Sequence, residues 1–222
     1  MKNWVFLLAL CMMGSVFAEE VTIGGKRFEV ELLYEEDFNG IGNRWRFDGR
    51  GRAWLESGRL QMDADGFECT AWFSEEMEGN LIVLYEAQIL APVEANNINL
   101  FFMATGPEGG DVLDVPLTGS YPEYHKLPNY IWTFTAAHTR LRRNPGFEIV
   151  SEDTETVPVP HKTHSFALTI LEGEIRCYID GRLIHAYDDL HPHRKGKLAF
   201  RTFRTRLWWD NLRIYRIVNS GG

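Results

Sequence analysis

Residues 165–188 read SFALTILEGEIRCYIDGRLIHAYD, and this stretch decides the fold class. Its three apolar runs are separated by Leu-Glu-Gly-Glu and Ile-Asp-Gly-Arg, which place turn residues between short segments. A glycine after an acidic residue is typical of the tight turns that join antiparallel strands. The stretch therefore predicts two successive β-hairpins.

The rest of the chain repeats this pattern, with little helical periodicity. Short runs rich in aromatic and branched residues recur between Gly, Pro, Asn and Asp, at 27–38, 58–64, 70–76, 81–90, 97–104, 129–136, 197–204 and 209–217. Such spacing is typical of β-sandwiches and jelly rolls. We expect an all-β fold, a two-sheet antiparallel jelly-roll sandwich formed by a single domain over residues 19–222.

The amino terminus, MKNWVFLLALCMMGSVFA (1–18), has the layout of a secretory signal peptide. Its removal would discard Cys11 and leave a secreted or periplasmic protein. No later segment is apolar for long enough to cross a bilayer. Cys69 and Cys177 each lie in an apolar run, so a disulfide and two buried free thiols both remain open.

Residues 129–146, NYIWTFTAAHTRLRRNPG, gather cations in a chain of formal net charge -8. If the segment is one continuous strand, alternation gives one face Tyr130, Trp132, Phe134, His138, Arg140 and Arg142. Arg143 then points the other way. The aromatic side chains could be core, but a core face would not end in unpartnered cations. We therefore interpret this face as the floor of a binding site with an anion-recognising end.

Two further segments hold candidate polar residues. In NINLFFMA (97–104), Asn97 and Asn99 alternate with a core-like set and share a face with Phe101 and Met103. Near the carboxyl end, Arg204 and Arg206 share strand parity, whereas Arg201 points the other way. Arg213 and Arg216 flank core-like residues, and we expect them to form structural salt bridges.

A cationic, aromatic surface suits nucleic acid, membrane lipid or sugar. Export and net acidity argue against nucleic acid. Lipid binding would require an amphipathic helix or a polybasic run, and neither is evident in the sequence. Aromatic faces pack on sugar rings, and arginine recognises carboxylate or sulfate. An acidic polysaccharide or oligosaccharide fits best.

Several blocks together resemble one known family: LLYEEDFNG, WRFDGRGRAWLESGRLQMDA, YPEYHKLPNYIWTF, HTRLRRNPGF and GKLAFRTFRTRLWWDNLRIYRI. They are similar to the YesU-like family of bacterial proteins, in the concanavalin A-like lectin and glucanase superfamily. The resemblance covers nearly the whole mature chain. It implies a two-sheet jelly roll with a concave ligand-binding sheet and an association with polysaccharide degradation. It supplies no established catalytic residues.

The residues favour elimination over hydrolysis. A retaining glycosidase needs two acids flanking one bond, and no Glu-x-Asp-x-Glu spacing occurs. Lyase-type elimination from a uronic-acid polymer needs a base, an acid and cations that stabilise the developing charge. The catalytic candidates are His138 or His125 as base, Tyr130 or Tyr124 as acid, and Arg140. The candidates for substrate binding are Asn97, Asn99, Glu123, Trp132, Arg142, Arg204 and Arg206.

Two alternatives stay open, a non-catalytic glycan-binding module and a glycoside hydrolase that depends on Glu123 or another carboxylate. No cofactor is expected. The residues 191–193, HPH, lack the other ligands of a zinc site and fit a turn. Asp37 and Asp210 could contribute to a structural calcium site, although their spacing alone does not indicate one.

Overall fold

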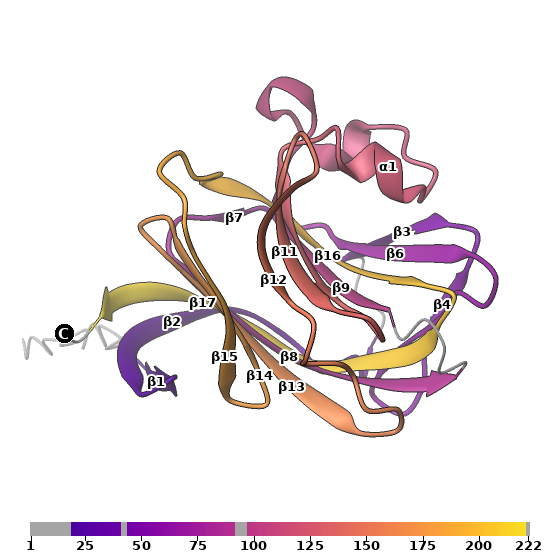
Figure 1. Ribbon diagram of the computed structural model, residues 1–222, viewed down its shortest axis with the longest axis horizontal. Helices are drawn as coiled ribbons and strands as arrows, with labels where there is room; N and C mark the ends of the chain where they lie inside the picture. Colours follow the sequence, from indigo (N-terminus) through magenta and orange to yellow (C-terminus); the bar gives the residue numbers. More distant parts are fainter. Residues whose placement is uncertain (1–18, 41–43, 92–96, 221–222) are drawn as a thin grey trace, which may run out of the picture.

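The computed structural model describes residues 19–40, 44–91 and 97–220. The signal segment 1–18, with Cys11, lies outside these residues. Two antiparallel sheets form a sandwich, as Figure 1 shows, and the expected all-β jelly-roll class is confirmed. No helix in the described part of the chain is long and apolar enough to span a membrane.

The described strands divide between the two sheets. The first sheet runs in the order β1 (Glu19–Ile23), β2 (Lys26–Glu36), β17 (Arg206–Ser220), β8 (Leu81–Ala91), β13 (Thr163–Leu171), β14 (Glu174–Ile179) and β15 (Arg182–Asp188), with β5 (Leu60–Asp63) beside β17 and β4 (Arg52–Leu55) beside β5. The second runs in the order β12 (Glu148–Asp153), β11 (Thr139–Asn144), β10 (Asn129–Phe134), β9 (Ile98–Ala104), β16 (Lys195–Phe203), β6 (Glu68–Phe73) and β3 (Trp45–Gly49), with β7 (Met77–Glu78) beside β16.

The two hairpins predicted from residues 165–188 are confirmed. Strand β13 pairs with β14, and β14 pairs with β15, both antiparallel. At each turn an acidic residue and the following glycine have positive φ: 51° and 93° at Glu172 and Gly173, 51° and 78° at Asp180 and Gly181. Two successive positive φ angles match the right-handed strand twist, which is why glycine is favoured there.

One large core lies between the sheets, and it contains the aromatic side chains of β10. Tyr130, Trp132 and Phe134 are each 1% exposed or less and pack in this cluster. Cys69 and Cys177 are free, buried thiols in the same cluster, and burial raises the pKa of Cys69 to about 12. Of the two possibilities that the sequence left open for these cysteines, the structure therefore has the unpaired one.

A second, smaller core lies on the outer face of the second sheet. Segment 106–128 covers that face with η1 (Pro107–Gly109), η2 (Val112–Asp114) and α1 (Tyr121–Tyr124), as the upper part of Figure 1 shows. Its apolar side chains, among them Tyr124 and Leu127, pack on Trp72, Phe101 and Ile131. The long segment is therefore anchored on the sheet and forms a wall above it.

The predicted salt bridges of Arg213 and Arg216 are confirmed. Strand β17 pairs with β2, which places Arg213 opposite Glu35 and Arg216 opposite Glu31. The Arg213 Nε lies 2.8 Å from Glu35 Oε1, and the Arg216 Nη1 lies 2.7 Å from Glu31 Oε2. These arginines are structural, on the first sheet, and away from segment 106–128.

Candidate functional site

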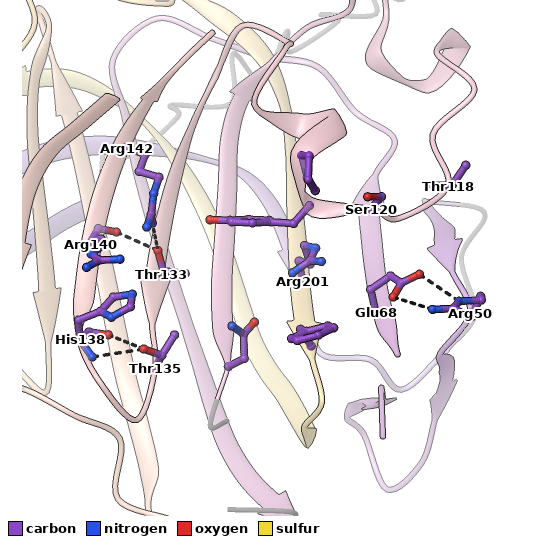
Figure 2. Close-up of a pocket in the computed structure, with 14 residues that line it drawn as sticks. Arg50, Glu68, Thr118, Ser120, Thr133, Thr135, His138, Arg140, Arg142 and Arg201 are labelled. Atoms are coloured by element: carbon purple, nitrogen blue, oxygen red, sulfur yellow. Dashed lines mark hydrogen bonds and ion pairs between the residues drawn. The ribbon is translucent and has the colours of Figure 1, made fainter. Parts of the chain in front are cut away.

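A pocket of about 770 Å³ lies where the outer face of the second sheet meets segment 106–128. Figure 2 shows that side chains from β6, β11, β16 and the wall segment converge on it. Its lining residues are Arg50, Glu68, Asn97, Thr118, Ser120, Tyr121, Pro122, Thr133, Thr135, His138, Arg140, Arg142, Arg201 and Phe203. Four arginines and one acidic residue give the pocket a cationic lining.

The hairpin of β10 and β11 decides which side chains reach the pocket. Phe134 pairs with Thr139, Thr133 with Arg140, and Ile131 with Arg142. Residues paired across strands share a face, so His138, Arg140 and Arg142 lie with Thr133 and Thr135 rather than with the aromatic residues.

The expectation that Tyr130, Trp132 and Phe134 share a face with the cations is therefore wrong. The chain turns back between Phe134 and Thr139, and this turn reverses the parity that a continuous strand would keep. The aromatic side chains form core instead of a pocket floor. The predicted orientation of Arg143 is confirmed: it points away from Arg140 and Arg142 and pairs with Asp189 at 2.7 Å.

Arg142 projects from β11 into the pocket, although it is only 3% exposed. Its Nη1 donates to Thr133 Oγ1 at 2.7 Å, and its guanidinium lies 5.0 Å from the ring centroid of Phe147. Its Nε has no hydrogen-bond partner among the described residues. Burial is the main reason why its pKa is lowered.

Arg201 projects into the pocket from β16, three strands away from β11 in the sheet, and is also 3% exposed. Its Nη2 donates to Gly119 O at 3.3 Å, which ties β16 to the wall segment. Its guanidinium lies 4.8 Å from the ring centroid of Tyr121 and 5.8 Å from that of Tyr124. Within the part of the chain that the structure describes, its Nε also lacks a hydrogen-bond partner, and burial lowers its pKa.

Acidic partners divide these arginines into two kinds. Arg140 pairs with Glu152 at 2.5 Å and Arg50 with Glu68 at 3.2 Å. Among the residues that the structure describes, Arg142 and Arg201 form no salt bridge. Burial of an uncompensated cation is costly, so a charge of opposite sign in the pocket would be bound strongly.

Buried polar atoms without hydrogen-bond partners concentrate around this pocket. In the described residues there are seven such side-chain atoms, and five belong to residues that line the pocket or contact a lining residue. They are Asn99 Oδ1, Tyr121 OH, His125 Nε2, Arg142 Nε and Arg201 Nε. Native proteins leave few such groups unsatisfied, and clusters of them are typical of ligand sites.

His138 is the lining residue best suited to act as a base. Its side chain faces the pocket from the turn before β11, where its backbone is held by Thr135 through a 3.3 Å hydrogen bond. Burial, Arg140 and Arg142 lower its pKa, in that order. The imidazole is therefore neutral at neutral pH and able to accept a proton.

Of the remaining predicted site residues, Asn97 lines the pocket and the others lie outside it. His125 follows α1, is 8% exposed, and its Nδ1 lies 3.1 Å from Asn144 Oδ1; burial lowers its pKa to about 4.

The Tyr124 hydroxyl lies 3.0 Å from Thr70 Oγ1 below the wall. The Tyr130 hydroxyl donates to Asp189 at 2.5 Å in the main core, and Glu123 accepts from Thr118. Asn97 lines the pocket, while Asn99 is buried beneath it.

Arg204 and Arg206 also lie outside the pocket, and Arg201 takes the position expected for them. Strand β16 ends at Phe203, and β17 begins at Arg206 in the other sheet. Alternation counted along the sequence from β16 into β17 therefore does not show which side chains share a face. Met103 is likewise in the main core, because its φ of 51° interrupts the alternation of β9.

Some of the residues that sequence reasoning missed come from the wall. Thr118, Ser120 and Tyr121 line the pocket, as do Arg50 and Glu68. The length and the Gly/Pro content of 106–128 predict a loop that either shapes a site or is mobile. Nothing in the sequence alone gives its position over β16.

Each candidate calcium ligand has a partner within the protein. Asp37 accepts hydrogen bonds from Asn39, and Asp210 pairs with Arg59 at 3.5 Å. Within the described ranges, no group of three or more His, Cys, Asp or Glu side chains is arranged to hold a metal.

Comparisons with known proteins agree with this architecture. A family model described as a domain of unknown function, DUF6250, matches residues 63–212. No curated protein matches the chain. A protein of unknown function with a galectin-like fold from Bacillus subtilis is similar in structure, with TM-score 0.76 and 21% identity over 85% of this chain and 97% of that chain.

Two functionally described structures are also similar. The carbohydrate-binding module CBM66 from Bacillus subtilis has TM-score 0.57 and 13% identity, over 76% of this chain and 93% of its own. An endo-β-1,3-glucanase from Pyrococcus furiosus has TM-score 0.62 and 14% identity, over 90% of this chain and 99% of its own. At these identities the likeness establishes the galectin-like, concanavalin A-like fold.

Proposed function

We propose that this chain, which belongs to the DUF6250 family, is a carbohydrate-binding protein whose pocket binds the carboxylate of an acidic sugar. The observation that carries the proposal is the pair Arg142 and Arg201, each 3% exposed and neither in a salt bridge with a described acid. A carboxylate bound to either guanidinium group would supply the missing charge and accept hydrogen bonds from it.

The rest of the pocket suits a sugar. Hydroxyl and amide side chains from three segments line it and would form hydrogen bonds with sugar hydroxyls. They belong to Asn97, Thr118, Ser120, Thr133 and Thr135. Structures of similar fold are described as a carbohydrate-binding module, a glucanase and a VIP36 lumenal domain bound to Man3GlcNAc. These likenesses support a glycan ligand, and the arginines favour an acidic one. A secreted or periplasmic location would bring the protein to such glycans.

Eliminative cleavage is the second candidate, favoured by His138. The neutral His138 imidazole would take the proton from the carbon beside the carboxylate, whose electrons form a carbon–carbon double bond as the glycosidic C–O bond breaks. Tyr121, which burial keeps protonated by raising its pKa, would donate its phenolic proton to the leaving oxygen. Arg142 and Arg201 would stabilise the charge that develops on the carboxylate. Hydrolysis is less suited, because Glu68 is the single carboxylate among the described lining residues.

The binding test compares acidic with neutral sugars. We expect calorimetry to detect binding of galacturonate, glucuronate or mannuronate trisaccharides, and weaker binding of their neutral counterparts. Arg142→Gln and Arg201→Met should abolish the preference for acid. Arg216→Ala, which removes an arginine from the first sheet, should leave it unchanged. Equal affinity for neutral sugars, or retention of the preference in both pocket variants, would contradict the proposal.

The elimination test uses the same sugars as polymers. An unsaturated product absorbs in the ultraviolet, and we expect His138→Asn to remove this signal while binding persists. If no acidic polymer gives the absorbance, the protein binds without cleaving by elimination.

A further inference from the structure

Two short Arg-x-Arg segments lie beside the pocket, and the proposed site uses only one of their four arginines. Arg50 and Arg52 flank Gly51 between β3 and β4, while Arg204 and Arg206 flank Thr205 between β16 and β17. Arg50 lines the pocket. The other three side chains are exposed and lie beyond it.

Both segments pack against the turn formed by residues 63–68. Arg52 and Arg206 are the cross-strand partners of Asp63 on its two sides. Gly51 N donates to Glu68 O at 2.9 Å, and Arg204 N donates to Phe67 O at 3.1 Å. The two Arg-x-Arg segments, which are far apart in sequence, therefore form one continuous surface.

Each of these arginines lies against an aromatic ring. The guanidinium of Arg50 is 4.6 Å from the ring centroid of Phe67, and that of Arg204 is 5.1 Å from Phe203. Those of Arg52 and Arg206 are 6.0 and 5.6 Å from Trp54. We call this surface the arginine–aromatic corner; it consists of Arg50, Arg52, Trp54, Phe67, Phe203, Arg204 and Arg206. Arg50 and Phe203 also line the pocket, so the corner continues it.

The charges of the corner are only partly compensated. Arg50 pairs with Glu68 and Arg52 with Asp63, each at 3.2 Å. Arg204 and Arg206 form no salt bridge with any acid in the part of the chain that the structure describes. Exposed arginines beside aromatic rings offer cations for carboxylates and apolar faces for sugar rings.

We propose that the arginine–aromatic corner binds the part of an acidic polysaccharide that extends beyond the pocket. This inference rests on the proposed function and deepens it, because it makes the ligand a polymer rather than a single acidic sugar. A polyuronate carries a carboxylate on every ring, so a chain that leaves the pocket past Arg50 and Phe203 brings further carboxylates to Arg204 and Arg206. Surface ion pairs are individually weak, and the corner would act through their number.

Oligosaccharides of two lengths distinguish binding at the corner from binding in the pocket. The probes are trisaccharides and decasaccharides of galacturonate, glucuronate and mannuronate, titrated at low ionic strength. We expect the decasaccharide to bind the wild type more tightly than the trisaccharide. The double variant Arg204→Ala/Arg206→Ala should lose roughly 3- to 10-fold in affinity for the decasaccharide and none for the trisaccharide. The matched double variant Arg213→Ala/Arg216→Ala, with two exposed arginines removed from the first sheet, should bind both probes as the wild type does.

The outcomes distinguish failure of the corner from failure of the pocket. If the corner variant binds the decasaccharide with wild-type affinity, the corner inference is overturned, while trisaccharide binding that requires Arg201 still supports the pocket. If Arg201→Met binds both probes unchanged, or no probe binds the wild type, the proposed function and the inference fall together. A steeper salt dependence for the decasaccharide, lost in the corner variant, would support the added ion contacts.

Discussion

At the scale of single residues, an acidic partner separates structural arginines from site arginines. Arg143, Arg213 and Arg216 each have a carboxylate within 2.8 Å. Arg142 and Arg201 are more deeply buried and have none among the described residues. An unpaired buried cation lowers the stability of the free protein, and proteins tolerate this cost mainly where a ligand needs it.

Replacing Arg201 with methionine should therefore stabilise the unliganded protein. Methionine fills similar volume between Tyr121 and Tyr124 without an uncompensated charge, and we expect the free energy of unfolding to rise by about 1–3 kcal/mol. Urea denaturation measures this difference. Arg143→Met is the matched control, and it should destabilise the protein because it removes the cationic partner of the buried Asp189 carboxylate. A destabilised Arg201→Met would mean that Arg201 holds the wall rather than a ligand.

At the scale of elements, the pocket depends on how closely the wall segment approaches the second sheet. Gly119 has φ +91°, and a Cβ built there would lie 2.5 Å from the Cα of Gly49, at the end of β3. Its carbonyl also accepts the hydrogen bond from Arg201. Because backbone meets backbone at this point, no side-chain adjustment can make room for a larger residue.

Gly119→Ala should therefore displace the wall and weaken ligand binding by about tenfold or more, equivalent to about 1.4 kcal/mol. Gly109→Ala tests the same wall without the clash, since Gly109 has φ +80° and no atom within 4 Å of a built Cβ. Both variants bear the cost of alanine at positive φ, about 1–2 kcal/mol. Melting temperatures of the two variants report the backbone strain that both share, and calorimetry reports the loss of ligand binding expected from displacement of the wall in Gly119→Ala alone. Equal binding by the two variants would argue against a role for the Gly119 contact.

At the scale of the whole molecule, a buried histidine joins the two sheets. His185 on β15 is 0% exposed; its Nε2 lies 2.9 Å from Thr139 Oγ1 on β11, and its Nδ1 lies 2.9 Å from Ser151 Oγ on β12. A neutral ring satisfies both contacts by accepting from Thr139 and donating to Ser151. Burial lowers the pKa of His185 to about 4, against the opposing effect of Asp153.

This histidine should make stability depend on pH. Its folded pKa lies below the unfolded value of about 6.5, so the unfolded chain binds the proton first. The stabilisation is complete above that value and is lost as pH falls towards 4, by about 3 kcal/mol in total. Urea unfolding at several pH values should show a weaker acid dependence for His185→Gln than for the wild type. His161→Gln, at an exposed position, serves as the control; identical pH curves for all three proteins would refute the role of His185.

The sequence by itself determined the fold class, the hairpins of 165–188 and the salt bridges of Arg213 and Arg216. These features depend on local turn chemistry and on alternation within an unbroken strand. It also placed His138, Arg140 and Arg142 on one side of their strand and Arg143 on the other.

Only the tertiary structure decided which face became core and which arginines have no acidic partner among the described residues. The turn between Phe134 and Thr139 and the change of sheet between Phe203 and Arg206 both break the parity that sequence reasoning carried across them. The environment of Arg201 depends on Gly119 and Tyr121, about eighty positions away along the chain. Periodicity assigns side chains to faces within a strand, whereas burial and charge pairing depend on contacts between distant segments that no local pattern contains.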